Sequence, residues 1–182
     1  MKELPGTLLE INPFKTFFKV GDLVNYEGPL LSLFSNERGD LYLYDWSDKD
    51  TRYNRWLIFR ITLDQLNHYL NGNLSHYQLI TTCYTDNIYS VDIDGQLNYH
   101  NIRQLNVDEI PPEYLPKSNV LHDDEESPHL DKIKVFIQKL ELKKGEILAK
   151  KWQDKFNIPI AQYKQMMQGR RKIVNREQLL TV

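Results

Sequence analysis

Apolar and polar residues alternate over much of the first hundred positions, a period typical of half-buried β-strands. The pattern predicts a hairpin in which "PLLSLFSN" and "DLYLYDW" are strands and "ERGD" is the turn, with Gly39 supplying a positive φ angle. An irregular segment is expected before this hairpin. Further strands are expected in "RWLIFRI", "HYQLITTCY", "DNIYSVDI" and "QLNYHNI", with "DIDGQ" as a turn between the last two.

One helix interrupts these strands, over residues 62–72. Thr62 is a good N-cap, and Gly72 is a natural stop. Between them three leucines recur at helical spacing, at Leu63, Leu66 and Leu70. The first 106 residues are therefore expected to form an α+β domain with a mostly antiparallel sheet and one or more short helices.

The pattern changes twice in the second half of the chain. Residues 107–129 hold four prolines and an acidic run, which predicts a linker or an extended strap over the surface. From residue 130 the period becomes helical, and one face collects Leu130, Ile133, Ile137 and Leu140. Three parts are thus expected: a domain at 1–106, an acidic linker at 107–129, and a basic helical module at 130–182.

Charge is distributed unevenly along the 182 residues, although the formal net charge is only −2. Residues 1–130 hold 10 Lys/Arg against 20 Asp/Glu, whereas residues 131–182 hold 13 against 5. Such asymmetry favours either a basic segment that meets nucleic acid or two parts that attract each other.

Few chemical motifs accompany this pattern. A single cysteine, Cys83, excludes an intrachain disulfide and a cysteine-built zinc site. We find no zinc-protease helix, phosphate-binding loop or nucleophile elbow, so neither an enzyme nor a metal or cofactor site is expected. No leader or membrane-spanning stretch is recognisable, which predicts a cytoplasmic protein.

The basic module contains a helix-turn-helix layout. "KKWQDKF" continues a helix, "NIP" interrupts it, and "IAQYKQMMQ" forms a second helix that ends at Gly169. Pro159 suits the first turn of that helix, and Asn157 tolerates a tight turn. With Ile158, Tyr163, Met166 and "GRRKI" at matching positions, residues 150–173 resemble the helix-turn-helix of phage repressors and antitoxins.

This resemblance implies double-stranded DNA as a partner. The second helix would enter the major groove with four residues near base edges, namely Ile160, Ala161, Gln162 and Gln165. Three cations would meet phosphates, namely Arg170, Arg171 and Lys172. The alternative is that these cations only complement the end of a helix, or that the basic module packs on the chain's own acidic residues.

A second candidate site lies around the loop "SDKDTRYN". Trp46, Tyr53 and Trp56 flank it; if exposed together they would form an aromatic patch for a protein partner, and if buried they belong to the core. Asp45, Asp48 and Asp50 cluster in "YDWSDKD", where a solvated role is favoured over metal or acid–base chemistry.

Residues 26–80 also resemble a family of uncharacterised bacterial and cyanobacterial proteins, through "GPLL", a glycine-started hairpin with Tyr42 and Leu43, the "WL" strand at Trp56, and the helix ending at Gly72. The resemblance implies a domain and a prokaryotic setting but no activity.

Together these observations favour a non-enzymatic regulatory or adaptor protein that binds a protein partner and, through its basic module, DNA. The alternative is an interaction protein whose basic segment packs on its own acidic domain.

Overall fold

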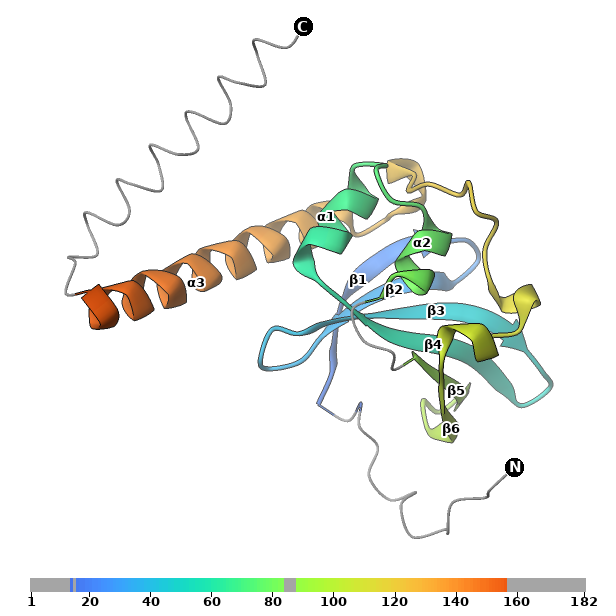
Figure 1. The fold of residues 1–182 in the computed structure, drawn as a ribbon. Coiled ribbons are helices and arrows are strands. Elements are labelled where there is room, and N and C mark those ends of the chain that lie inside the picture. Colours follow the sequence, from blue (N-terminus) through green and yellow to red (C-terminus); the bar gives the residue numbers. More distant parts are fainter. Residues whose placement is uncertain (1–13, 15, 84–87, 157–182) are drawn as a thin grey trace, which may run out of the picture. The chain divides into compact units, whose positions relative to one another are not determined.

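The computed structural model describes residue 14, residues 16–83 and residues 88–156 (Figure 1). The chain divides into two compact units, Met1–Val135 and Phe136–Val182. Within the described residues, six strands form one antiparallel sheet in chain order: β1 (Phe18–Asn25), β2 (Pro29–Ser35), β3 (Leu41–Lys49), β4 (Tyr53–Ile61), β5 (Ile88–Asp94) and β6 (Tyr99–Leu105). The α+β class expected from the sequence is confirmed.

Two short helices follow β4 and lie together against the sheet (Figure 1). Helix α1 (Leu63–Leu70) begins at Thr62, whose hydroxyl accepts from the backbone of Gln65, and Gly72 follows its end with a φ of 69°. Both expected signals are confirmed. A cap of this kind stabilises a helix by about 1 kcal/mol.

The strand expected in "HYQLITTCY" is wrong, because this stretch forms helix α2 (His76–Thr81). Ser75 explains the difference, since its hydroxyl accepts from the backbone of Gln78 while the Gln78 side chain accepts from the backbone of Ser75. This reciprocal capping fixes the first turn of a helix and overrides the β-propensity of the residues that follow.

The irregular segment expected before the first hairpin is also wrong, since it forms β1. Three register shifts interrupt its pairing with β2, and four consecutive residues, Val20 to Leu23, are buried. The shifts remove the simple alternation that identifies a strand in a sequence. By contrast, the β2–β3 hairpin follows the expectation, and Gly39 in its turn has a φ of 81°.

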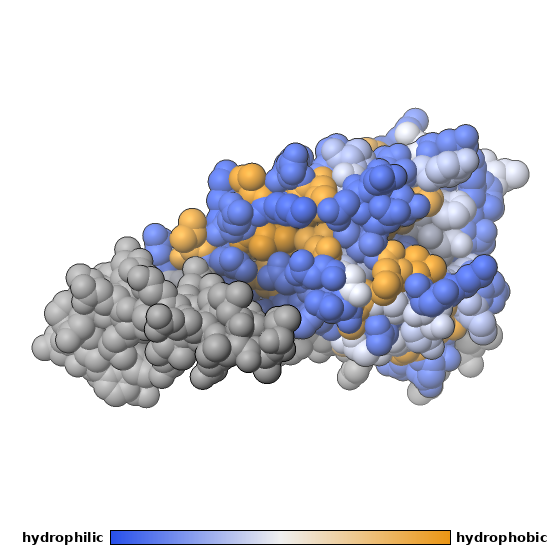
Figure 2. All heavy atoms as spheres, turned by 90° about the horizontal axis from the view of Figure 1, so that it is seen from above, coloured by the Kyte–Doolittle hydropathy of each residue, from blue (hydrophilic) through white to orange (hydrophobic). Residues whose placement is uncertain are grey.

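The sheet has two differently covered faces. One face carries large apolar side chains that are fully buried beneath α1 and α2, among them Leu31, Leu33, Leu43, Leu57, Phe59 and Ile88. The other carries Tyr44, Ile58 and Val91, and the buried ring of Phe14 packs on it. Figure 2 views the molecule from the side of α1 in Figure 1, where hydrophilic side chains surround the apolar areas.

The segment after β6 runs as three single-turn helices, η1 (Val107–Glu109), η2 (Pro112–Tyr114) and η3 (Asp124–Glu126). It leads into α3 (Leu130–Phe156), whose helical period is confirmed. The first turns of α3 pack on β1, where Ile133 is fully buried beside Gly21. Ser127 and His129 bond to the backbone of Asp22: the Ser127 hydroxyl donates to its carbonyl at 3.1 Å, and His129 Nδ1 accepts its N–H at 3.0 Å.

Candidate functional site

Trp46 and Trp56 lie directly opposite each other on β3 and β4. Side chains at opposed positions of an antiparallel pair share one face of the sheet, so the two indoles form a patch on the face opposite α1 and α2. Trp46 is 36% exposed and Trp56 is half-buried. The indole N–H of Trp46 donates to Asn54 Oδ1 at 3.2 Å, which fixes the orientation of the exposed ring.

Further aromatic rings extend this face away from the tryptophans. Phe34 stacks on Tyr44 with ring centroids 4.0 Å apart, and Phe17 contacts Tyr42 at 4.3 Å. Phe14 packs edge-on against Tyr44 and Tyr89. Burial raises the pKa of Tyr44 far above its usual value, so its hydroxyl stays neutral. We call the surface formed by the two tryptophans with Phe34 and Tyr42 the aromatic face.

Tyr53 does not join the tryptophans. It pairs with Asp94 on β5, and its ring lies 5.0 Å from that of His100. Because successive side chains along a strand point to opposite faces, Tyr53 belongs to the face opposite Trp56. The structure therefore brings two of the three expected aromatic residues together and separates the third.

The seven residues expected to contact DNA, which are Ile160, Ala161, Gln162, Gln165, Arg170, Arg171 and Lys172, lie outside the described residues. Of the basic module, the structure describes α3 as far as Phe156. Five lysines of that helix beyond residue 135 are exposed: Lys139, Lys143, Lys144, Lys150 and Lys151.

The three clustered aspartates of the β3–β4 region have separate roles. Asp45 is buried, and its carboxylate lies 3.1 Å from His76 Nε2. Asp48 accepts from the hydroxyl of Tyr114 at 3.4 Å. Asp50 accepts the backbone N–H groups of Arg52 and Tyr53, which closes the loop and holds the pKa of Asp50 below its usual value. This division of roles favours structural functions over shared acid–base chemistry.

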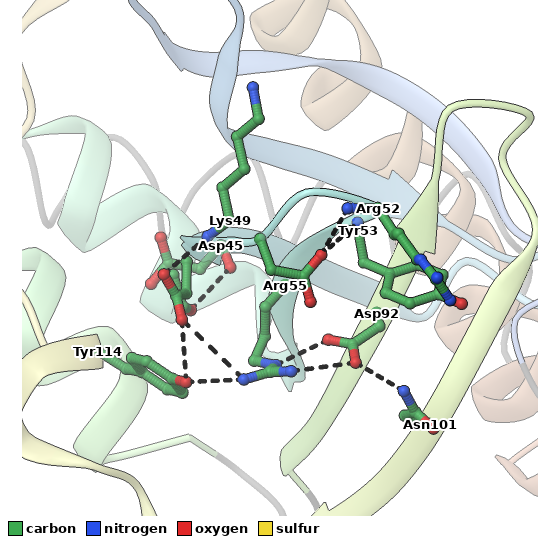
Figure 3. A network of polar contacts seen from close by, with 11 residues as sticks. Asp45, Lys49, Arg52, Tyr53, Arg55, Asp92, Asn101 and Tyr114 are labelled. Carbon is green, nitrogen blue, oxygen red and sulfur yellow. Dashed lines mark hydrogen bonds and ion pairs between the residues drawn. The ribbon is translucent and has the colours of Figure 1, made fainter.

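A bidentate ion pair joins β4 to β5 beside this loop (Figure 3). The Arg55 guanidinium donates to both carboxylate oxygens of Asp92, at 2.7 and 3.0 Å. Its third nitrogen donates to the hydroxyl of Tyr114 at 2.9 Å, while Asn101 donates to Asp92 at 2.9 Å. Burial raises the pKa of Asp92, but the hydrogen bonds from Arg55 and Asn101 outweigh burial, and the net pKa is lowered.

A serine, a histidine and an aspartate also meet at β1, but in an order unsuited to nucleophilic catalysis. The Ser32 hydroxyl donates to the buried carboxylate of Asp22, and His129 Nδ1 lies 3.3 Å from the other oxygen of that carboxylate. A catalytic serine instead hydrogen-bonds to the imidazole, which removes its proton. Lys19 contacts the same carboxylate at 2.6 Å. Lys19 therefore neutralises Asp22, whereas His129 Nδ1 already accepts the Asp22 N–H and presents no proton to the carboxylate.

Two further findings concern the described part of the chain. Among its residues, no group of three or more His, Cys, Asp or Glu side chains is arranged to hold a metal ion. The helices described there are also too short or too polar to cross a membrane.

A family model described as "Family of unknown function (DUF6575)" matches residues 16–175. The chain belongs to this family. The match includes the earlier resemblance at residues 26–80 and runs from the start of β1 through α3, so DUF6575 covers the sheet and most of the basic module together. Comparison with curated proteins and with solved structures gave no match.

The sequence does not reveal the positions of two residues of this DUF6575 protein, Arg55 in its ion pair and His122 in the interior. Arg55 appears in the sequence only as a cation at the start of a strand, and its partner Asp92 lies 37 positions away. His122 lies in the acidic segment and carries no motif, yet its side chain is 1% exposed. Neither the pairing of Arg55 with Asp92 nor the contact of His122 with Tyr69 produces a periodic pattern in the sequence.

Proposed function

We propose that this DUF6575 protein is a non-enzymatic adaptor that binds a protein partner through its aromatic face. The observation that carries the proposal is the pairing of Trp46 with Trp56 on a sheet face that the described residues leave partly open. Tryptophan and tyrosine dominate the energetically important positions of protein interfaces, because they bury a large area at a small entropic cost.

Orientation and charge support a protein partner at this face. The Trp46 indole is held by Asn54, so little rotational freedom is lost on binding. Aromatic sheet faces also bind single-stranded nucleic acid, but such surfaces are flanked by net positive charge. Residues 1–130 have twice as many acidic as basic residues, which favours a protein over a polyanion.

Replacing Trp46 by serine is expected to weaken partner binding by about tenfold or more, as loss of a central aromatic contact usually does. The partner is first captured by a photo-crosslinking residue placed at position 46 of the full chain in the source cells. The purified partner is then titrated against the wild type and the variant by calorimetry. Because Trp46 is partly exposed, the substitution leaves the fold intact, which circular dichroism verifies.

Leu121→Ser is the matched control, because Leu121 is 52% exposed and belongs to the segment between η2 and η3. This control is expected to bind the partner as tightly as the wild type. Equal affinity of the Trp46→Ser variant and the wild type contradicts the proposal, as does capture of no protein from position 46.

DNA binding by the basic module is a second candidate function. The exposed lysines of α3 support it, because further along the sequence three more cations follow Gly169. Lys134, near the start of α3, lies 3.7 Å from Asp124, so one cation of this helix is engaged by the chain's own acidic segment. Contact of Arg170, Arg171 and Lys172 with phosphates would give binding that weakens with salt.

Binding of the full chain to a labelled DNA duplex is expected to weaken between about 50 and 200 mM salt, with a log–log slope of about −3 for three phosphate contacts. The Arg170→Ala/Arg171→Ala double variant is expected to reduce that slope to about −1. Fluorescence anisotropy provides both slopes. Arg38→Ala/Arg52→Ala, at two exposed arginines of the first unit, is the control and keeps the wild-type slope. Absent or salt-independent binding excludes this function.

A further inference from the structure

The segment 115–127, which we call the strap, is tied to the rest of the first unit by hydrogen bonds near both ends and in its middle. The hydroxyl of Tyr114, just before it, accepts from the Arg55 guanidinium and donates to the Asp48 carboxylate. The carbonyl of Val120 accepts the backbone N–H of His76, the first residue of α2, at 2.9 Å. At its end, Ser127 is buried and donates to the Asp22 carbonyl.

His122 is the side chain by which the strap enters the interior. Its side chain is 1% exposed, and its ring centroid lies 5.1 Å from that of the buried Tyr69 of α1. Both ring nitrogens are buried without a hydrogen-bond partner. The closest carboxylate, that of Asp124, lies 3.1 Å from Nε2 without hydrogen-bond geometry and is itself 62% exposed.

The charges around this imidazole do not compensate for its burial. Asp123 and Asp124 on the strap favour a proton on His122, whereas Lys134 of α3 opposes one. The His76 imidazole also lies near Tyr69, with ring centroids 6.2 Å apart, and its Nε2 lies 3.1 Å from the buried carboxylate of Asp45. Burial is the largest influence and lowers the pKa of His122 below its ordinary value, with the acidic neighbours only partly opposing it.

We propose that the strap is a pH-sensitive closure, seated on the sheet and helices of its own unit while His122 is neutral and released when His122 takes up a proton. A charged imidazole is costly at this position, because its side chain is 1% exposed against Tyr69 and the nearest carboxylate, that of Asp124, lies largely in solvent. Hydration of the imidazolium becomes possible once the strap lifts, and lifting uncovers the side of the unit that holds Tyr69, His76 and Asp45.

The direction of the effect follows from the two pKa values of His122. In the open strap the pKa is the ordinary value of about 6.5, and in the closed strap it is lower. Above about pH 6.5 the imidazole is neutral in both states, so the closed state is not penalised. Below that pH the open state binds the proton more readily, and the opening constant rises by up to about tenfold per pH unit until the closed-state pKa is reached.

Trypsin reports on this opening, because Lys117 is the one Lys or Arg between Arg103 and Lys132 in the sequence. The full chain is incubated with trypsin at about pH 7.5 and pH 5.5, and cleavage after Lys117 is divided by cleavage of a free Lys-Ser peptide at each pH. We expect the corrected rate to rise up to about tenfold at the lower pH. In His122→Phe, which keeps a ring against Tyr69 but cannot titrate, we expect no rise.

His68→Gln is the matched control, since His68 is an exposed histidine of α1, and it is expected to keep the wild-type response. A flat corrected rate in the wild type overturns the proposal, and so does an undiminished rise in His122→Phe. Should that variant fail to fold, NMR titration of the histidine rings in the wild-type protein decides the matter. A His122 that titrates at or above about pH 6.5 in the closed protein overturns the proposal.

Discussion

Replacing Arg55 by methionine is expected to lower the free energy of unfolding by about 3 kcal/mol, because it removes the cation from a largely buried ion pair. Asp92 is 3% exposed and would keep Asn101 as a hydrogen-bond donor but lose both bonds from the guanidinium. Arg55 itself is 32% exposed, which places the effect at the lower end of that for buried pairs. Urea unfolding at neutral pH measures the change.

The same variant makes a prediction about pH. The pKa of Asp92 lies below its ordinary value in the folded protein, so the ion pair contributes its full stability above about pH 4 and loses it as the pH falls through the folded pKa. The stability difference between wild type and Arg55→Met is therefore expected to shrink in acid. Arg52→Met, at an exposed arginine just before β4, is the control and should change the free energy of unfolding by less than about 0.5 kcal/mol. A difference that grows below pH 4 contradicts this account.

Replacing Gly21 by alanine is expected to destabilise the protein by up to about 3 kcal/mol, through overpacking. A Cβ at this position would lie 2.7 Å from the Cβ of His129 and 3.1 Å from Cγ1 of Ile133. The first of these atoms is fixed to the backbone, so the start of α3 must move away from β1. Thermal or urea unfolding measures the loss of stability.

Gly95→Ala is the matched control for Gly21→Ala, because a Cβ at Gly95 meets no atom within 4 Å. This variant is expected to retain wild-type stability. In the wild type the backbone N–H of Asp22 donates to His129. The NMR signal of this N–H should shift in Gly21→Ala and keep its position in the control. Equal stability of the two variants would show that α3 does not depend on close contact with β1.

Local signals explain which parts of the fold the sequence predicts. The β2–β3 hairpin depends on Gly39 and on alternation within a few residues, and α1 depends on Thr62 and Gly72 at its ends. Helix α2 is not predicted because β-forming residues follow its capping residues, Ser75 and Gln78, and dominate the local pattern. The position of the strap could not be predicted, because its contacts with Asp22 and His76 join residues far apart in the chain.

The candidate site is predictable to the same limited extent. Trp46, Tyr53 and Trp56 stand out by residue type, but the face each one occupies depends on the β3–β4 register and on the alternation within β4. The odd spacing between Tyr53 and Trp56 already places them on opposite faces of one strand. That Trp56 lies opposite Trp46 depends on the register of the two strands, which sequence spacing alone does not provide.

Ser127 donates a hydrogen bond to the Asp22 carbonyl and His129 accepts one from the Asp22 N–H, which matters for any shortened form of the chain. β1 is the outermost strand at its side of the described sheet, and these two residues occupy backbone groups that would otherwise be open to a strand of another molecule. A fragment that ends at residue 106 retains all six strands but loses this protection. Such a fragment is therefore expected to be prone to edge-to-edge aggregation, because it lacks the segment that covers these groups of β1 in the full chain.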